Sequence, residues 1–523
     1  MVTPSAPDPA LLRVYQNLLD SVAEEMGTAL ERTGFSPNIK ERRDYSCAVF
    51  DAAGEMVAQA AHNPVHLGST PLSVRAAIDA HQFQRGDEII LNDPYQGGTH
   101  LPDLTLVRAV FEECQQEPSF YVANRAHHAD VGGAARGSMA LFTEIYQEGL
   151  RIPPLLFRRG GEPVVEVEKL ILANMRQPQE RIGDLRAQLI ANRVGEAAVL
   201  RLLERGNRRE LLDYCQHLKD AAERHVQALL EQIPDGCYRA EEVLDGDGFQ
   251  SGEIPIHVAI TVKGKHCLVD FAGTSPQVTG CLNTHPAVVL SAIFYCVRAL
   301  AGEEIPSNQG CLRPVEMRIP PGSLLDPQIP AAVAGGNVET SQRLVDVLFL
   351  ALATALPERV PAQSQGTMNN LTLGSAEGGR EAFSYYETVG GGMGAGPWGP
   401  GASAVHSHMT NTRNTPIEVL EHTIPVRVRE YSIRRGSGGA GQHRGGEGIV
   451  RELEVLVPMQ VAVLSERRTR GPAGISGGSP GSPGQNLRIK ADTRETLPGK
   501  WQGTLQPGER LRLETPGGGG WGS

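Results

Sequence analysis

The spacing of apolar residues changes several times along the chain, and each change predicts a different element. Apolar side chains recur every three to four residues over residues 11–32, which predicts an amphipathic helix that ends at Gly34. A further helical run covers residues 71–81. Strand-like runs follow at residues 88–91 and 119–123. The first part of the chain is therefore predicted to mix helices with strands.

A predicted β-hairpin lies between the first two helices. Residues 44–50 and 55–59 form two short strand-like runs around the turn sequence at residues 51–54. Asp44 opens the first strand, where a polar residue either forms a turn or serves as a ligand. The local pattern favours the turn-forming role.

The middle of the chain is rich in Leu, Arg, Glu and Ala and has few glycines, a composition typical of solvated helices. The predicted helices are residues 169–175, 179–193 and 197–232.

After residue 235 the pattern shifts toward strands. Residues 254–262 and 266–271 alternate around a Lys-Gly-Lys turn, which predicts a second hairpin. The nearly continuous apolar run at residues 286–301 is too long for a typical strand and predicts a buried helix. Another apolar helix runs to Ala355, and Thr340 and Ser341 are its candidate N-terminal caps.

The last part of the chain alternates short strands with Gly and Pro turns, and residues 390–401 form a glycine-rich loop that cannot build a core by itself. Taken together, the elements predict a mixed α/β (α+β) protein. The predicted regions are an N-terminal α/β region (1–165), which holds the candidate chemistry described below, a helical segment (166–235), a mixed α/β region (236–405) and a β-rich C-terminal region punctuated by Gly and Pro (406–523).

Composition narrows the class of protein. The 523 residues, 40% hydrophobic and 21% charged, are those of a soluble globular protein that can bury a large core. A net charge of -11 gives no basic field for nucleic acid or an anionic membrane. No signal-like N-terminus or apolar span of roughly 18 residues is present, so we expect a cytoplasmic location. The eight cysteines form no Cys-x-x-Cys pair, which argues against a zinc ribbon or a disulfide framework.

The strongest candidate chemistry is a pair of His-x-x-Asp units on glycine-rich loops. His100 with Asp103 and His127 with Asp130 each follow a predicted strand, about two dozen residues apart. Imidazole nitrogen and carboxylate oxygen together suit zinc, manganese, iron or cobalt rather than calcium. The alternative is that His128 and Asp130 stabilise a turn and that Asp103 caps one.

The sequence contains no G-x-x-x-x-G-K-[ST] motif, so it offers no phosphate-binding loop of that type. If the protein's activity uses a nucleotide, we expect a partner to bind it.

Several collinear motifs give the sequence a resemblance that covers nearly the whole chain. It is similar to the hydantoinase B family, which comprises the B subunits or C-terminal halves of ATP-dependent 5-oxoprolinases, N-methylhydantoinases and caprolactamase, and related subunits of acetone and acetophenone carboxylases. The motifs are Glu41-Arg42-Arg43-Asp44-Tyr45-Ser46, Pro64-Val65-His66-Leu67-Gly68, Asn92-Asp93-Pro94-Tyr95, Gly97-Gly98-Thr99-His100-Leu101-Pro102-Asp103, the loop 127–133, Gly335-Gly336-Asn337-Val338-Glu339-Thr340-Ser341-Gln342-Arg343, Gln365-Gly366-Thr367-Met368-Asn369-Asn370, Met409-Thr410-Asn411-Thr412-Arg413, Ser437-Gly438-Gly439-Ala440-Gly441, Arg444-Gly445-Gly446 and Thr515-Pro516-Gly517-Gly518-Gly519-Gly520.

The resemblance implies that this chain is the metal-bearing half of a two-component enzyme. The implied ligands of a divalent transition metal are Asp44, His100, Asp103 and His127. This replaces the turn-forming role of Asp44, and His127 is preferred to its neighbour because the second position varies in similar proteins. His128 and Asp130 are expected in catalytic positions outside the ligand set, where Asp130 would orient the ligating histidines.

The resemblance also implies a partner and a reaction. A hydantoinase A-like, actin-like ATPase subunit would use ATP to activate a small-molecule substrate, in a hetero-oligomer such as α2β2. The expected reaction is ATP-dependent hydrolysis of a lactam or cyclic ureide, such as 5-oxoproline or a hydantoin. The alternatives are a subunit of an ATP-dependent ketone carboxylase and a non-catalytic scaffold for the ATPase subunit.

Overall fold

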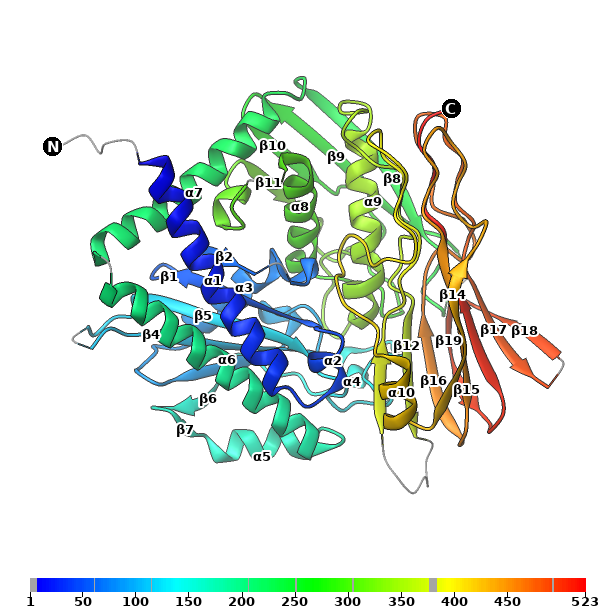
Figure 1. Cartoon of the computed structure of the whole chain (residues 1–523), viewed down its shortest axis with the longest axis horizontal. Coiled ribbons are helices and arrows are strands. Elements are labelled where there is room, and N and C mark those ends of the chain that lie inside the picture. The colour runs from blue at the N-terminus through cyan, green and yellow to red at the C-terminus, as the bar shows by residue number, and fades with distance from the viewer. Residues whose placement is uncertain are drawn as a thin grey trace.

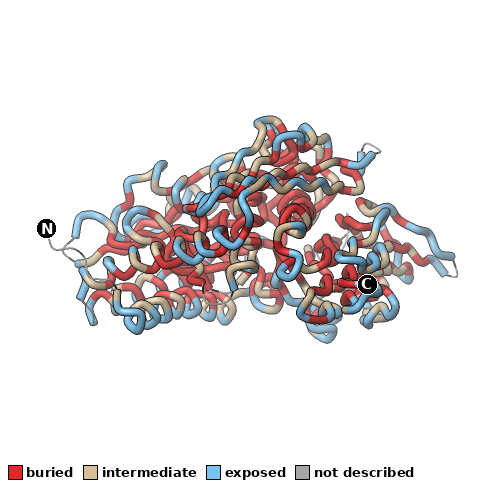
Figure 2. The backbone as a smooth tube through the Cα atoms, turned by 90° about the horizontal axis from the view of Figure 1, so that it is seen from above, coloured by how far each residue is buried: buried red, intermediate tan, exposed pale blue. Residues whose placement is uncertain are grey.

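The computed structural model describes residues 7–60, 62–113, 115–205, 207–249, 252–302, 305–375, 383–491 and 493–523. Four β-sheets and the helices around them form the molecule, with the C-terminal strands gathered at one end (Figure 1). Buried backbone fills the centre, and exposed residues lie along the rim (Figure 2). The predicted mixture of helix and sheet is confirmed.

The largest sheet is antiparallel, with its strands in the order β2-β1-β5-β4-β3-β6-β7. Its strands are β1 (Tyr45–Asp51), β2 (Met56–Gln59), β3 (Glu88–Leu91), β4 (Asp103–Val110), β5 (Phe120–His127), β6 (Leu155–Arg159) and β7 (Glu162–Pro163). The predicted first hairpin is confirmed as β1 and β2. Because side chains alternate across a strand, Tyr45, Cys47 and Val49 enter one apolar cluster, whereas Ala48 and Phe50 enter another on the opposite face.

Helices cover both faces of this sheet. Helices α1 (Pro9–Thr33), α6 (Pro178–Arg205) and α7 (Arg208–Leu230) cover one face (Figure 1). Helix α3 (Ser69–Ala80) packs on the other face, and α8 (Pro286–Ala301) packs on α3. The predicted first helix is confirmed, and the Gly34 N–H donates to the Leu30 carbonyl at its end.

The predicted boundary between two long helices, between residues 193 and 197, is wrong. Helix α6 continues without a break to Arg205, and the side chain of Asn207 caps the start of α7. Gly195 lies inside α6, where a Cβ atom would come within 2.4 Å of the Met26 sulfur on α1. The glycine therefore permits close helix packing instead of ending the helix.

A second sheet, β11-β10-β9-β8, lies beside α9 (Ser341–Leu352), which also packs on α8. Its strands are β8 (Gly236–Leu244), β9 (Ile254–Lys263), β10 (His266–Asp270) and β11 (Val315–Arg318). The second hairpin and the buried helix α8 are confirmed. The capping prediction for α9 is wrong, because the π-helix η4 (Gly336–Thr340) runs directly into it. Both hydroxyls instead donate to carbonyls, Thr340 to Leu282 and Ser341 to Asn337.

The C-terminal part contains two sheets that share one apolar cluster (Figure 1). The first sheet, β13-β12-β16-β19, combines β12 (Asn370–Ser375), β13 (Ser384–Glu387), β16 (Met459–Leu464) and β19 (Lys500–Leu505). The second, β14-β15-β20-β17-β18, contains β14 (Val426–Arg434), β15 (Gly448–Val455), β17 (Gln485–Lys490), β18 (Thr493–Leu497) and β20 (Arg510–Glu514). The first sheet joins strands from either side of residue 405, and the predicted region boundaries stay a prediction.

Glycine-rich segments connect these strands and pack against one another through their backbones. The Gly439 N–H donates to the Gly518 carbonyl, and the Gly518 N–H donates to the Gly446 carbonyl. The Gly446 N–H in turn donates to the Met393 carbonyl in the glycine-rich loop 390–401. That loop is therefore one segment of a backbone-paired assembly.

Shorter elements complete the described chain. They are α2 (Pro37–Lys40), η1 (Pro64–His66), η2 (Pro94–Gln96), α4 (Ile145–Glu148), α5 (Val165–Ala173), η3 (Gln309–Leu312) and α10 (Ile417–Thr423). Six of the seven described cysteines are buried, whereas Cys237 is exposed and Cys114 lies outside the described residues. Among the described residues, no helix is both long and apolar enough to cross a membrane.

Candidate metal centre

Strand register brings two of the predicted ligands together. Asp103 is the first residue of β4 and His127 the last of β5, and the two residues are paired across the antiparallel ladder. Facing residues in such a pair have Cβ atoms roughly 5 Å apart. The expectation that both His-x-x-Asp units lie past strand ends is therefore corrected, because pairing extends as far as Asp103 and His127. His100 lies in the turn just before β4, and its carbonyl accepts the Asp103 N–H.

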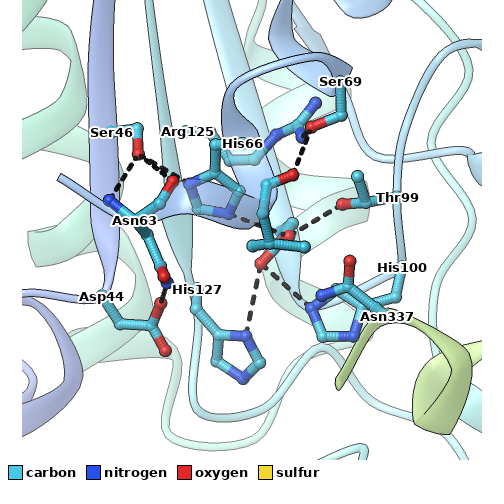
Figure 3. A network of polar contacts seen from close by, with 12 residues as sticks. Asp44, Ser46, Asn63, His66, Ser69, Thr99, His100, Arg125, His127 and Asn337 are labelled. Carbon is cyan, nitrogen blue, oxygen red and sulfur yellow. Dashed lines mark hydrogen bonds and ion pairs between the residues drawn. The ribbon is translucent and has the colours of Figure 1, made fainter. Parts of the chain in front are cut away.

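The imidazole rings of His100 and His127 point toward the same carboxylate oxygen (Figure 3). Asp103 Oδ1 lies 3.0 Å from His100 Nε2 and 3.3 Å from His127 Nδ1. Each of the three residues offers one potential ligand atom, and these three atoms lie within 4.8 Å of one another. All three residues are buried. The structure thus places the pair of histidines and the shared aspartate in one compact cluster.

Different groups hold the second oxygen of Asp103. Thr99 Oγ1 donates to Oδ2 at 2.7 Å, and His66 Nε2 lies 3.3 Å from the same oxygen. His66 Nδ1 lies 2.8 Å from the Ser46 hydroxyl on β1. Sequence reasoning did not assign His66 to the site, although it lies in one of the family-like motifs directly after the hairpin that Asp44 opens.

Burial and neighbouring groups set the charges of the cluster. Burial favours a raised pKa for Asp103, but its interactions with His100, His127 and His66 outweigh burial and hold that pKa well below its usual value. Burial lowers the pKa of His127, and interactions with Asp103 and Asp44 offset part of this effect. The cluster therefore presents an ionised carboxylate and a neutral imidazole, the forms that bind metal ions.

Asp44 lies next to this cluster. Its carbonyl accepts the His127 N–H, because β1 pairs with β5 in a register that places Tyr45 opposite Ala126. Asn63 Nδ2 donates to Asp44 Oδ1 at 2.8 Å, and Oδ2 lies 3.7 Å from the Arg42 guanidinium. The structure brings Asp44 beside His127 but outside the group of three ligand atoms. Its membership in the ligand set stays a prediction.

His128 and Asp130 make contacts that lead away from the cluster. His128 Nε2 lies 2.9 Å from Gln188 Oε1 on α6, and burial lowers the pKa of His128 to about 4. Asp130 accepts the N–H groups of Gly132 and Gly137. Asp130 also pairs with Arg176 at 3.1 Å. These bonds hold the loop and the adjoining helix in place, and a catalytic role for either residue stays a prediction.

The residues of the cluster fit a transition-metal ion. His127 Nε2 and both ring nitrogens of His100 have no hydrogen-bond partner, although they are buried; the 3.0 Å approach of His100 Nε2 to Asp103 is poorly aligned for a hydrogen bond. An unpaired buried polar atom costs about 1–3 kcal/mol. Donor atoms bound to one zinc ion at roughly 2 Å lie about 3.3 Å apart, close to the two contacts of Asp103 Oδ1. A bound divalent ion would therefore give one of these unpaired atoms, His100 Nε2, the partner that the chain does not.

Comparison with known proteins places the chain in a family. The profile of the family described as Hydantoinase B/oxoprolinase matches residues 8–523. The chain belongs to this family. It is 40% identical to 5-oxoprolinase 1 of Arabidopsis thaliana over 99% of its length, and 30% identical to the putative B subunit of a D-/L-hydantoinase from a Pseudomonas species, also over 99%. It spans 42% of the length of the plant protein and 90% of the bacterial one.

Two solved structures share the fold of this hydantoinase B/oxoprolinase chain. The ATP-dependent caprolactamase of Pseudomonas jessenii superposes with a TM-score of 0.91 at 31% identity, over 99% of this chain and 92% of that one. An acetone carboxylase structure superposes with a TM-score of 0.89, over 98% of this chain and 76% of that one. Its 18% identity supports a likeness of fold only. The family resemblance and the fold class predicted from the sequence are thus both confirmed.

Proposed function

We propose that this chain is the metal-binding B subunit of an ATP-dependent cyclic-amide hydrolase that opens a lactam or hydantoin ring. The observation that carries the proposal is the buried group of His100, Asp103 and His127, with ligand atoms within 4.8 Å of one another. The group lies in a chain whose relatives are named as a 5-oxoprolinase and as the B subunit of a hydantoinase. Of the alternatives, the carboxylase has support from a likeness of fold alone.

Four residues would hold the metal ion: His100, Asp103, His127 and, beside them, Asp44. A divalent transition metal bound there (zinc, manganese, iron or cobalt) would polarise the reacting carbonyl or lower the pKa of a bound water. The protein contributes a buried cluster in which the neighbouring histidines hold the pKa of Asp103 well below its usual value.

Neighbouring side chains orient these ligands. Thr99 and His66 fix one oxygen of Asp103, which leaves the other facing the two histidines. Tyr386 stacks on His127 with ring centroids 4.6 Å apart. Its hydroxyl donates to Asn370 Oδ1 at 2.8 Å, and this bond fixes the tyrosine ring. Such outer contacts typically set the orientation and basicity of a ligating imidazole.

The proposal includes a hydantoinase A-like ATPase partner. The sequence has no phosphate-binding loop of the Walker type, and a ring amide is stabilised by resonance, so that its opening benefits from activation by ATP. One relative is named as the B component of a hydantoinase and one solved relative is described as ATP-dependent, which supports a hetero-oligomer such as α2β2.

Replacing His127 with Ala tests the proposal. We expect the transition-metal content, measured by elemental analysis, to fall from roughly one ion per chain to almost none. The reconstituted complex with its ATPase partner should then lose ATP-coupled ring opening. The matched control is His225→Ala, because His225 is an exposed histidine on α7. Full metal content and turnover in His127→Ala would overturn the proposal.

Two further measurements separate the alternatives. A carboxylase would form its product only with bicarbonate or carbon dioxide present, whereas a hydrolase would not need either. A scaffold for the ATPase subunit would contain no bound transition metal in the wild-type chain.

A further inference from the structure

A cleft of about 240 Å³ lies between the loop that follows β5 and the sheet β13-β12-β16-β19. We name it the Arg136 cleft; its polar lining residues are Arg136, Thr372, Gln460, Gln502 and Thr504. A single water molecule needs roughly 10–15 Å³, so the cleft has room for a small ion or molecule.

Strand register places three of these polar side chains on one face of the sheet. Gln460 on β16 is paired with Gly374 on β12 and with Thr504 on β19. Two residues further along β16, Ala462 is paired with Gln502. Side chains two residues apart in a strand point to the same side. Gln460, Gln502 and Thr504 therefore share the face that lines the cleft.

The backbone on both sides of Arg136 is fixed by hydrogen bonds. The Ala135 carbonyl accepts a bond from Arg176 Nη1 at 3.1 Å. The Gly137 N–H donates to Asp130 Oδ2 at 2.9 Å. Arg176 also pairs with Asp130 at 3.1 Å, which joins the two supports. The loop therefore holds Arg136 in one place relative to the sheet.

The side chain of Arg136 lies against β12 at a glycine. A Cβ atom on Gly374 would lie 2.6 Å from Arg136 Cβ and 2.7 Å from Arg136 Cδ, so a larger residue there would displace the arginine. Arg136 is half-buried, and its guanidinium makes no hydrogen bond or ion pair with any residue that the structure describes. The cleft thus holds a positioned cation without a counter-charge.

The other polar groups of the cleft can donate hydrogen bonds and are accessible to solvent. Gln502 and Thr504 are exposed, and Gln460 is half-buried. Gln502 Oε1 accepts the Leu141 N–H at 3.2 Å, which leaves Gln502 Nε2 as a free donor. The side chains of Gln460 and Thr504 make no hydrogen bond within the described chain. None of the described residues that line the cleft is acidic, so nothing in its lining repels an anion.

We propose that the Arg136 cleft binds a small oxyanion, either a carboxylate or a phosphate. The planar guanidinium of Arg136 pairs with two oxygen atoms of the ligand, and Gln502 Nε2 and the Thr504 hydroxyl donate to the oxygen atoms that remain accessible. The whole chain carries a net charge of -11, so a bound anion is held by this local arrangement and not by the overall charge.

The choice of these two ligand classes rests on the proposed function. Amide hydrolysis coupled to ATP releases a carboxylate and a phosphate, and both are oxyanions. The cleft itself does not depend on the metal centre, because none of the proposed metal ligands lines it.

The first test titrates the full-length wild-type chain with sodium phosphate and, separately, with sodium acetate at constant ionic strength. Line broadening in the phosphorus NMR spectrum of phosphate and in the proton NMR spectrum of acetate measures binding. We expect at least one of the two anions to bind with a dissociation constant of about 1 mM or tighter, and the anion that binds identifies the ligand class. Failure of both anions to bind in the millimolar range would overturn the proposal.

Charge-removing variants locate the binding. Arg136→Gln should weaken the affinity for the bound anion about tenfold or more, because it removes the charged donor. The matched control Arg186→Gln, at an exposed arginine on α6, removes the same charge from the chain and should leave the affinity unchanged. Equal weakening in the two variants, or none in Arg136→Gln, refutes the cleft as the binding site.

Two further variants test the geometry of the cleft. Gly374→Ala keeps the charge but displaces the arginine side chain, so the affinity should fall although Arg136 is still present. Thr504→Val removes one exposed hydroxyl and should weaken binding about threefold. Wild-type affinity in both variants would contradict the proposed arrangement. If circular dichroism shows that Gly374→Ala does not fold, Arg136→Gln and Thr504→Val still decide.

The same titration on His127→Ala separates this proposal from the proposed function. The cleft predicts that this variant keeps the wild-type affinity for the anion even without metal. If the affinity is lost in His127→Ala but survives in Arg136→Gln, the anion binds at the metal centre and the cleft is refuted. If the affinity depends on Arg136 while metal content and ring opening are unaffected in His127→Ala, only the proposed function fails.

Discussion

The seven-stranded sheet and the glycine-rich C-terminal segments achieve close packing by opposite means. In the sheet, side chains fill both faces, and even charged groups are buried with partners: Arg125 bonds to the hydroxyls of Thr105, Ser69 and Ser73. In the C-terminal segments the backbones themselves touch. A Cβ atom on Gly518 would lie 2.0 Å from the Met393 carbonyl oxygen.

The difference explains where chemistry is possible. A metal centre needs imidazole and carboxylate groups at fixed separations, and the register of β4 and β5 provides them by pairing Asp103 with His127. The glycines of the C-terminal segments have no side chains to offer, so their role is to join strands of the C-terminal part at short range. The packing and chemistry of the seven-stranded sheet depend on which side chains are present. The packing of the glycine-rich segments depends on the absence of side chains.

The largest effect should follow from adding one methyl group to the glycine region. We expect Gly518→Ala to reduce the free energy of unfolding by about 4 kcal/mol or more, because the new Cβ would overlap backbone atoms that cannot move independently. Denaturant unfolding would measure the change.

The matched control is Gly236→Ala on β8. The nearest atom to a Cβ at this position is the Tyr238 hydroxyl oxygen at 3.5 Å, an ordinary contact. We expect a change below about 1 kcal/mol for this variant. If both substitutions had the same small effect, close backbone packing would not be what stabilises the glycine region.

Much of the fold could be predicted from the sequence wherever one spacing of apolar residues persists over a whole element. Helix α8 has the predicted bounds, since an apolar run of that length has few other structures available. The break within α6 was mispredicted because Gly195 looks like a helix end until Met26 is known to pack against it. Loop 390–401 shows the same limit: its glycines indicate a loop locally, whereas their partners are glycines far along the sequence.

The next largest effect concerns a buried carboxyl group outside the glycine-rich segments. Glu148 accepts the N–H groups of Val333 and Ala334 just before η4, and burial raises the pKa of Glu148 to about 8. A raised pKa means that the folded state holds the proton more tightly than the unfolded state. The stabilisation is therefore present below about pH 4.5 and lost as the pH rises to about 8.

The isosteric variant Glu148→Gln should remove this pH dependence. Relative to pH 4, the wild-type protein should lose about 3 kcal/mol at pH 7 through this group, and the variant should not. Unfolding free energies at several pH values would show the two curves diverging above pH 5. Parallel curves would mean that Glu148 titrates normally in the folded protein. Gly518→Ala should leave the pH dependence unchanged, because it alters no titratable group.

The candidate site was predictable to the extent that its ligands lie close in sequence. The spacing of His100 and Asp103 and the second unit at His127 indicate a metal site from the sequence alone. His66 was missed because its contact with Asp103 depends on how η1 packs against β4, which no local pattern encodes. For Asp130, the sequence left a turn-stabilising role open, and the folded chain shows this carboxylate bonded to the loop that follows it.

The smallest effect should come from His66, which touches Asp103 but is outside the proposed ligand set. Its Nε2 faces Asp103 Oδ2, and its Nδ1 faces Ser46. The two substitutions His66→Gln and His66→Asn separate these contacts, since a glutamine amide can occupy the place of Nε2 and an asparagine amide that of Nδ1. We expect His66→Asn to weaken metal binding roughly 10- to 100-fold, and His66→Gln to retain most of the affinity.

Competition with a chelator at fixed pH would measure both affinities, and circular dichroism would confirm that both variants fold. If the two variants lost affinity equally, the bond to Asp103 would not be what matters, and His66 would act only by filling space. If Gln alone preserved the affinity, the orientation of one carboxylate would depend on a single hydrogen bond. The metal centre would then be sensitive to the loss of one side-chain atom, His66 Nε2. The glycine-rich segments are sensitive to the opposite change, the addition of a side-chain atom.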